Sequence, residues 1–456
     1  MDRRIFLAGT AVAAAGLGRS TQTPTSDTIR VAIVGLRGRG RDHISAWIDE
    51  PGVRIAALCD VDESLLQKYT QQIESRGKPR PVGIPDFRRL LEDRSIDIVS
   101  IASPNHHHAL QTIWACQAGK DVYVEKPCSH TIHEARQMVI AARRYGHIVQ
   151  HGTQSRSIPV VQEAISQLRA GRIGDVYMAR AICYKWRDSI GRAPVEPVPP
   201  GVHYDLWMGP APAHPFSRNR FHYNWHWQWD YGNGEIGNQG IHEIDVARWG
   251  LGVTYPVRVS AMGGHVMFDD EQQTPNHMTA SFEFDCGGKT KSLVFEHRHW
   301  MVNGEAGIGD SSGMATNAIG NIFYGCGGYM AVDGQDTNYK TWLGKERRVG
   351  PARAQAAGTL EDLWYRVQRR WGGAPARGGD HFGNFLAAVR ACDRTKLNAD
   401  IEEGAISTTL VHLANISYRL RRTIEFDPKT LTCPDREAQA MFTKPYREPF
   451  TLPSLA

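Results

Sequence analysis

The fold of this 456-residue chain is decided near its start, where the sequence reads Ile29-Arg30-Val31-Ala32-Ile33-Val34-Gly35-Leu36-Arg37-Gly38-Arg39-Gly40. The first half of this stretch is β-branched and almost continuously apolar, as is typical of a strand buried on both faces of a parallel sheet. The second half is a glycine-rich turn, and a helix is expected over roughly residues 41–49. A strand, a glycine turn and a helix in this order predict the first unit of a doubly wound α/β sheet.

The glycine turn has the composition of a pyrophosphate-binding loop. Gly35, Gly38 and Gly40 let backbone N–H groups approach a phosphate at the positive end of the following helix. A second expected strand, over residues 53–58, leads to Asp60, which lies 25 residues beyond Gly35. That spacing fits a carboxylate that binds a ribose 2′-hydroxyl, and such a carboxylate repels the 2′-phosphate of NADP. NAD is therefore the expected cofactor.

Arg37 departs from the usual pattern, because it occupies the place of the second glycine of the turn. Its side chain either contacts a phosphate or points to solvent. Together with Arg39 and Arg41, it keeps NADP open as the alternative cofactor. A glycine turn with a purely structural role is the other alternative.

Strands and helices are expected to alternate from residue 28 to residue 152, which predicts a Rossmann domain that binds NAD(P). From residue 153 to 456 we expect an α/β domain for substrate binding and oligomerisation, built on a large, mostly antiparallel sheet. Strands are predicted over residues 257–263, 278–284 and 292–297, and residues 304–328 are predicted to form a long loop. C-terminal helices over about residues 380–422 are expected to pack back toward the Rossmann domain.

The first 27 residues predict an export signal of the twin-arginine type. Arg3-Arg4 precedes an apolar stretch over about residues 5–17, which is followed by a polar run to residue 27. The apolar stretch is shorter than the roughly 20 residues of a spanning helix, so no stable membrane span is expected after leader removal. Such signals are read by a pathway for folded proteins, so we expect a periplasmic or otherwise exported protein that carries its cofactor.

Charge and cysteine patterns exclude other classes. The net charge of +5 is spread without a basic stripe, so no nucleic-acid partner is expected. The eight cysteines include no C-x-x-C pair, which argues against a disulfide scaffold and a thiolate zinc site. The histidine clusters at 106–108 and 296–299 contain no helical i, i+4 pair, so no metal site is expected.

Two motifs follow later strands of the expected Rossmann sheet, at the edge where ligands bind. They are Ser103-Pro104-Asn105 and Glu125-Lys126-Pro127. With the glycine turn, Ala118-Gly119-Lys120 and the segment 237–245, they give a chain that resembles the Gfo/Idh/MocA family, which includes glucose–fructose oxidoreductase and inositol dehydrogenases. The resemblance spans essentially all of the chain after the leader.

The resemblance implies a cofactor that lies between a Rossmann domain and an open-sheet domain, facing a sugar, cyclitol or related polyol. It also implies a homo-oligomer, a dimer or tetramer, formed through the open sheet. It assigns Asn105 and His108 to the nicotinamide pocket, and Ser103, Glu125 and Lys126 to cofactor binding.

Lys126 is the leading candidate for moving the hydroxyl proton when hydride passes to nicotinamide, provided that its surroundings lower its pKa. Family dehydrogenases commonly carry Asp-x-x-x-His on a helix, and here the pair is Asn238 and His242. Asparagine cannot carry a proton, so acid–base chemistry falls to His242 and Lys126. Glu235 or Asp245 is an alternative candidate for the role of the missing aspartate. A buried structural role is an equal alternative for Asp245.

Substrate contacts are expected from the aromatic run at residues 221–230. Trp225, Trp227 and Trp229 alternate, which puts three indoles on one face if the segment is extended, ready to stack on a sugar; core packing is the alternative. Gln154 and Arg156 are further substrate candidates. Other basic side chains nearby are open to carboxylate or phosphate recognition but are expected on the surface: Lys185, Arg187, Arg218 and Arg220.

The sequence as a whole predicts an exported oxidoreductase that retains NAD(P) and moves hydride to and from a secondary alcohol or ketone of a sugar, glycoside or polyol. One alternative is an NAD-dependent glycoside hydrolase of the same fold, which oxidises its substrate transiently and eliminates the aglycone. The motifs that we associate with the N-acetylgalactosaminidase branch are not evident. A second alternative is a non-catalytic protein that retains the nucleotide.

Overall fold

The computed structural model describes residues 28–309, 317–334, 338–353 and 381–455. The predicted export segment, residues 1–27, lies outside the described residues. Within the described part of the chain, no helix is long and apolar enough to cross a membrane.

The N-terminal domain is built on a six-stranded parallel sheet in the order β3-β2-β1-β4-β5-β6, which confirms the predicted Rossmann fold. The strand order reverses between β1 and β4, and ligands bind at this switch point in doubly wound sheets. The strands are β1 Ile29–Val34, β2 Val53–Cys59, β3 Val82–Ile84, β4 Ile98–Ile101, β5 Asp121–Val124 and β6 Val149–His151. The helices are α1 Arg39–Trp47, α2 Glu63–Ser75, α3 Phe87–Leu90, α4 Asn105–Gln117 and α5 Ile132–Tyr145.

Two of these helices begin earlier than the apolar spacing predicts, and both differences matter for the site. Helix α1 begins directly after Gly38, which has a positive φ of 46°. Helix α4 begins at Asn105, directly after Pro104, and its first turn is polar yet buried. An apolar pattern cannot reveal such a turn, because the apolar residues of α4 begin only at Ala109.

The second domain contains a nine-stranded sheet in the order β14-β13-β12-β11-β7-β10-β9-β8-β15, in which only the β7–β10 pair is parallel. Its strands are β7 Val176–Tyr184, β8 Arg258–Gly264, β9 His277–Asp285, β10 Thr290–Arg298, β11 Ala318–Gly325, β12 Gly328–Asp333, β13 Asn338–Leu343, β14 Arg348–Val349 and β15 Ile424–Glu425. Its helices are α6 Pro159–Arg169, α7 Tyr204–Met208, α8 Gly234–Asn238, α9 Gly240–Leu251, α11 His381–Ala391, α12 Ile401–Leu420 and α13 Arg436–Ala440, with 3-10 turns η1 Gln154–Ser157, η2 His222–Trp227 and η3 Arg394–Lys396.

The expectation of one long loop over residues 304–328 is wrong, because β11 runs through its second half. The strand was hidden by its polar and small residues, which have packing roles. A Cβ at Gly320 would lie 2.4 Å from the carbonyl oxygen of Val332 on β12. The buried side chain of Asn321 donates to the carbonyl of Glu243 in α9, at 2.7 Å.

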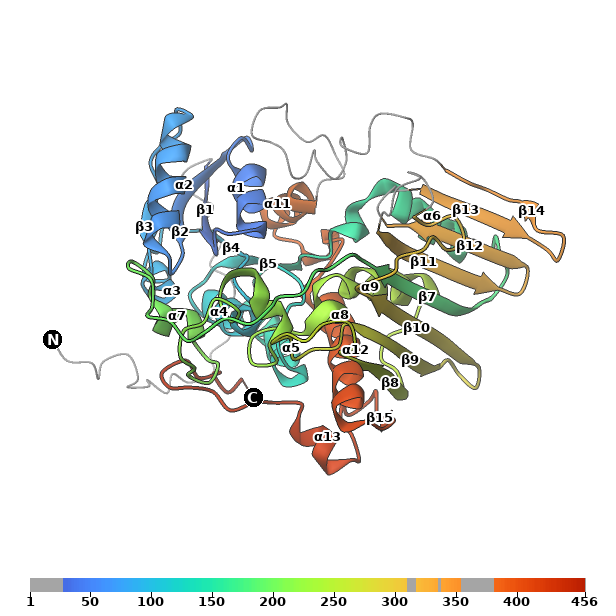
Figure 1. The fold of residues 1–456 in the computed structure, drawn as a ribbon. Helices are drawn as coiled ribbons and strands as arrows, with labels where there is room; N and C mark the ends of the chain where they lie inside the picture. The colour runs from blue at the N-terminus through green and yellow to red at the C-terminus, as the bar shows by residue number, and fades with distance from the viewer. Residues whose placement is uncertain (1–27, 310–316, 335–337, 354–380, 456) are drawn as a thin grey trace.

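Helices α9 and α12 lie between the two sheets (Figure 1). Helix α11 packs on the Rossmann sheet, where Phe382 stacks on Tyr123 with ring centroids 4.3 Å apart. Helix α12 contacts α5 on one side and β8 on the other. The structure thus places both C-terminal helices against the Rossmann domain.

A buried ion pair holds the turn η1, which follows the last strand of the Rossmann sheet, against helices α9 and α12. Arg156, in η1, donates two hydrogen bonds to Asp245 of α9 at 2.7 and 2.9 Å and one to Glu403 of α12 at 3.0 Å. The side chains of Arg156 and Asp245 are 5% and 1% exposed. Of the two roles expected for Asp245, the structure therefore supports that of a buried structural acid. The guanidinium of Arg156 is taken up by these carboxylates and is not available to a substrate.

Replacing Arg156 by Met is expected to lower the free energy of unfolding by about 3–5 kcal/mol, because it leaves a buried carboxylate without its main partner. Arg218→Met is the matched control, since Arg218 is 72% exposed and pairs with Glu196 at the surface. The control is expected to lose less than about 1 kcal/mol. Urea unfolding of both variants checks this; equal losses would refute a fastening role.

Candidate functional site

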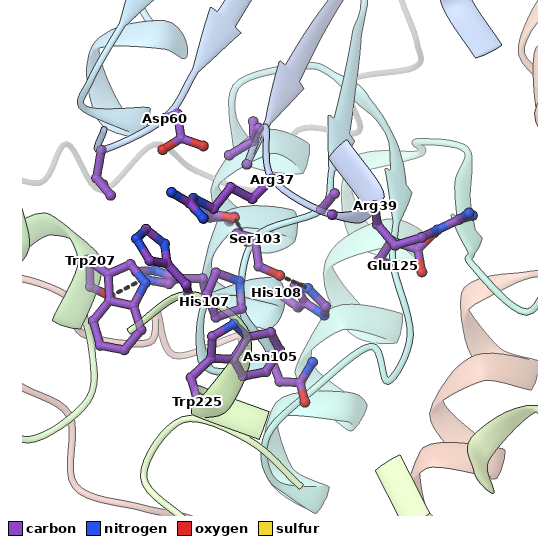
Figure 2. Close-up of a pocket in the computed structure, with 18 of the residues that line it drawn as sticks. Arg37, Arg39, Asp60, Ser103, Asn105, His107, His108, Glu125, Trp207 and Trp225 are labelled. Atoms are coloured by element: carbon purple, nitrogen blue, oxygen red, sulfur yellow. Dashed lines mark hydrogen bonds and ion pairs between the residues drawn. The ribbon is translucent and has the colours of Figure 1, made fainter. Parts of the chain in front are cut away.

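One cavity of about 750 Å³ runs from the glycine turn to the second domain, along the carboxyl edge of the Rossmann sheet. It brings together most of the residues singled out in the sequence (Figure 2). Its walls include Gly35, Arg37, Gly38, Asp60, Ser103, Asn105, His108, Glu125, Lys126, Gln154, Trp225, Asn238 and His242. Several sequence candidates do not line it, namely Gly40, Arg156, Arg218, Arg220, Trp227, Trp229, Glu235 and Asp245.

The glycine turn has the geometry of a phosphate cradle. Gly35 has φ +80°, and a Cβ there would lie 2.7 Å from the carbonyl oxygen of Ala102. A Cβ at Gly38 would meet nothing within 4 Å, so the turn is open on that side. Gly40 serves packing, since its Cβ would lie 1.9 Å from the carbonyl oxygen of Gly35. The turn therefore fits a dinucleotide, with Gly40 bringing α1 close to it.

Asp60 is held at the end of β2 with its carboxylate anchored on both oxygens. One oxygen accepts from the backbone N–H of Leu36 at 2.6 Å, and the other from that of Asp62 at 3.0 Å. Burial raises the pKa of Asp60 to about 6, so the group is still mainly ionised at neutral pH. The remaining lone pairs are available to ribose hydroxyls.

The three arginines that leave NADP open as the cofactor all line the cavity, but their side chains have different partners. Arg41 donates to the backbone carbonyl of Gly38 at 3.5 Å. Arg39 is occupied, because it donates to Glu125 at 3.0 Å and to Asp42 at 2.8 Å. The side chain of Arg37 is 54% exposed, and its nearest carboxylate oxygen, on Asp62, is 3.9 Å away. Figure 2 places Arg37 between Asp60 and Ser103. The side chains of Arg37 and Arg39 both border the cavity. Arg37 is exposed there, whereas Arg39 is held by two carboxylates of the protein.

Glu125 is enclosed by donors. It accepts from Arg39, from His43 at 3.3 Å and from Gln154 at 3.0 Å. Burial by itself raises the pKa of Glu125, but Arg39 and His43 outweigh this effect and hold the pKa well below its ordinary value. Glu125 is therefore a fixed anion and not a proton carrier.

Lys126 is half-buried, and its Nζ donates to the backbone carbonyl of Asn238 at 2.5 Å. Burial lowers the pKa of this amine to about 8; Glu125 opposes the shift, while Arg39 and Lys185 add to it. A lysine with this pKa is able to exchange a proton near neutral pH. The sequence did not reveal that the backbone of Asn238, and not its side chain, holds Lys126.

His242 lies in the first turn of α9 and is 8% exposed. Burial, with Lys126 adding to it, lowers the pKa of His242 well below its ordinary value, so the ring is neutral. Its Nδ1 has no hydrogen-bond partner among the described residues. The ring of His242 lines the cavity, so this neutral side chain is available for a hydrogen bond with a ligand hydroxyl.

The three consecutive histidines of α4 have protein partners. Both ring nitrogens of His108 lie 2.7 Å from carbonyl oxygens, those of Pro127 and Ser103, so His108 joins two strand-end loops. His106 and His107 each direct Nε2 to the carbonyl of Trp207. Across the residues that the structure describes, no three His, Cys, Asp or Glu side chains are grouped to hold a metal ion.

The prediction of three tryptophans on one face is wrong, because residues 222–227 form a 3-10 turn and not an extended segment. In a helix of three residues per turn, alternate side chains point in different directions. Trp225 lines the cavity and stacks on His226. Trp227 is 3% exposed and lies behind the cavity wall, and Trp229 packs against Tyr418.

Lys185 and Arg187 were expected on the surface. This expectation is also wrong, because both side chains line the cavity. Arg187 forms two hydrogen bonds with Glu235, at 2.9 and 3.0 Å, and one with the hydroxyl of Tyr223, at 2.8 Å. Burial alone raises the pKa of Glu235, but Arg187 reverses the effect and holds it well below its ordinary value, which removes Glu235 as a proton donor. The signal in the sequence was the apolar run at the end of β7, whose last residue, Tyr184, directly precedes Lys185.

Asp60→Ala is expected to weaken NAD binding about 10- to 100-fold, since it removes a charged acceptor from the ribose. NADP binding should change less, so the preference for NAD should shrink. Asp49→Ala, at a half-exposed surface pair with Lys78, is the matched control. Calorimetric titration of nucleotide-free protein measures both affinities; equal binding of NAD and NADP by the unaltered protein would contradict this role.

Comparisons with known proteins agree with this geometry. Two models of one oxidoreductase family match the chain: the NAD-binding Rossmann fold over residues 29–153, and the C-terminal alpha/beta domain over residues 166–286 and 374–452. A glycosyl hydrolase family 109 protein from Shewanella pealeana is 34% identical over 125 residues, which is 26% of this chain and 27% of the relative. The match thus spans about a quarter of that relative's length.

Solved structures show the same fold. Levoglucosan dehydrogenase, in complex with NADH and levoglucosan, has a TM-score of 0.64 at 17% identity, covering 87% of this chain and 99% of that one. An aldose–aldose oxidoreductase from Caulobacter crescentus, complexed with glycerol, has a TM-score of 0.61 at 18% identity, covering 88% and 100%. Since the family models match both domains, the chain belongs to the Gfo/Idh/MocA oxidoreductase family, with an N-terminal domain that binds NAD.

Proposed function

We propose that the protein is an exported oxidoreductase that retains NAD and transfers hydride to and from a secondary alcohol or ketone of a sugar, glycoside or polyol. The observation that carries the proposal is the amine of Lys126, with a pKa of about 8, on the wall of the cavity that begins at the glycine turn. Two proteins that share the fold, the levoglucosan dehydrogenase and the aldose–aldose oxidoreductase, have names that describe enzymes acting on sugars.

The glycine turn and Asp60 would hold NAD, which would supply the hydride acceptor for the carbon that carries the substrate hydroxyl. Neutral Lys126 takes the hydroxyl proton, and its ammonium form returns a proton to the ketone in the reverse direction. The carbonyl of Asn238 fixes the amine in place. His242 remains neutral, and its ring, which lines the cavity, binds the reacting hydroxyl or a neighbouring one.

Residues outside the Rossmann domain, among them Trp207 and Phe221, also line the cavity, which favours retention of a bound nucleotide. The segment before α7 pairs with the end of β2, since the N–H of His203 donates to the carbonyl of Val61 at 2.8 Å and that of Glu63 to Gly201 at 3.0 Å. Phe450, near the C-terminus, also lines the cavity. A retained cofactor suits export, because no soluble NAD pool is available outside the cytoplasm. A second carbonyl substrate would then reoxidise it in place.

The glycoside hydrolase alternative is favoured by the match to the family 109 protein. In that reaction, oxidation at C3 of the sugar acidifies the C2 proton, the aglycone leaves by elimination, water adds, and the hydride returns. No net oxidation occurs, which also suits a retained cofactor. Release of free sugar from a glycoside, without added oxidant, would identify this reaction; the same assay with neither release nor cofactor reduction would support the non-catalytic alternative.

The pH profile tests the role of Lys126. In the oxidation direction kcat/KM is expected to rise with pH and to level off above about 8, because the neutral amine accepts the proton. In the reduction direction it should fall over the same range, because the ammonium form donates. Lys126→Met should lose about 10²- to 10⁴-fold, and Lys126→Arg should lose as much because arginine does not release its proton.

Lys289→Met is the matched control for these variants, since Lys289 is 81% exposed on the second domain. It should leave both pH profiles unchanged. A Lys126→Met protein that retained full turnover would remove Lys126 from the mechanism.

A further inference from the structure

The substrate end of the cavity contains a cation that no carboxylate of the described protein neutralises. We propose, on the basis of the function proposed above, that the substrate carries a carboxylate, as in a uronic or aldonic acid, and that Lys185 binds this carboxylate.

Lys185 is aimed into the cavity by the backbone that follows β7. The N–H of Lys185 donates to the carbonyl of Arg298 at 2.9 Å, and that of Arg187 to the carbonyl of His299 at 3.0 Å, so the chain continues extended beside β10. Residues two apart on an extended chain share a face, and both side chains line the cavity. The residue between them, Trp186, instead contacts Trp300, with ring centroids 4.9 Å apart.

Arg187 and Lys185 differ in their partners. The guanidinium of Arg187 is occupied by both oxygens of Glu235 and by Tyr223. The Nζ of Lys185 donates to the side-chain oxygen of Gln239 at 3.1 Å and to no carboxylate of the described residues. Arg187 is thus neutralised, whereas Lys185 has one neutral partner and two N–H groups to spare.

The next acid along this chain of contacts does not supply a counter-charge. Gln239 donates to Glu243 at 3.2 Å, but burial raises the pKa of Glu243 to about 8, so this carboxyl is protonated at neutral pH. Glu125, near Lys126, is engaged by Arg39. The basic groups at this end therefore outnumber the ionised acids, and oxidised nicotinamide would add a further positive charge.

A substrate carboxylate fits this arrangement better than a phosphate. The two unused N–H groups of Lys185 match the two oxygens of one carboxylate, and charge-assisted hydrogen bonds of this kind are among the strongest. A phosphate has more oxygens to satisfy and is commonly held by an arginine fork or by several backbone N–H groups. The fork of Arg187 is occupied by Glu235, so we assign the site to a carboxylate.

The test compares matched sugars on the holoenzyme, with reduction of the bound nucleotide as the readout: glucuronate against glucose, galacturonate against galactose, and gluconate against sorbitol. For at least one pair, the acid is expected to have a kcat/KM about 10- to 100-fold above that of its neutral partner, chiefly through KM. Lys185→Met should bring this ratio close to one. The control Lys289→Met should preserve it.

Two outcomes would overturn the assignment. If Lys185 acts only by lowering the pKa of Lys126, Lys185→Met will shift the pH profile equally for acid and neutral sugar and leave their ratio unchanged. If glucose 6-phosphate is used better than glucuronate and this advantage is lost in Lys185→Met, the site takes phosphate. Partial recovery of the acid preference in Lys185→Arg, which restores the charge, would support carboxylate binding.

Failure of the proposed hydride transfer can be distinguished from failure of carboxylate binding by Lys185. If no sugar reduces the nucleotide, hydride transfer fails, and binding of glucuronate, galacturonate and gluconate is measured by calorimetry instead. Binding that Lys185→Met weakens at least tenfold would support the carboxylate site by itself. Absence of binding, or equal binding by both proteins, would overturn it.

Discussion

The ion pair between Arg39 and Glu125 is the interaction on which the rest of the site depends. It joins the first residue of α1, which begins at the glycine turn, to the end of β5, where Lys126 follows. Because Arg39 and His43 fix Glu125 as an anion, this carboxyl is no competitor for the substrate proton. Desolvation then lowers the pKa of Lys126 to about 8, so this amine is able to exchange a proton near neutral pH.

The chemistry is divided between two domains that must meet correctly. The Rossmann domain supplies Lys126, while the second domain supplies the carbonyl that holds its amine and the ring of His242. The buried pair of Arg156 and Asp245, with Glu403 of α12, holds α9 against α12 and the turn after the Rossmann sheet. Stability and catalysis are therefore coupled, since α9 contains His242 and contacts α8, whose last residue, Asn238, holds Lys126.

The Rossmann half could be predicted closely from sequence because its signals are local: apolar strands, a glycine turn and polar residues at strand ends. The second half was harder, because its decisive contacts join distant residues. β11 contains the buried Asn321, which bonds to α9, and Gly320, which packs closely against β12. Such residues are also typical of loops, so the sequence predicted a loop here. Trp227 and Lys185 were misplaced because their positions depend on a 3-10 turn and on the parallel β7–β10 pair, which the sequence pattern did not reveal.

The central claim, that hydride passes between substrates through a nucleotide that stays in the protein, is tested most directly by isotope transfer. A sugar carrying deuterium on the oxidised carbon is incubated with the protein, a second carbonyl sugar and an excess of unlabelled free NAD. The account predicts that mass spectrometry will find deuterium in the alcohol formed from the second sugar and none in free NADH. Deuterium in the free nucleotide pool, or no transfer at all, would contradict it.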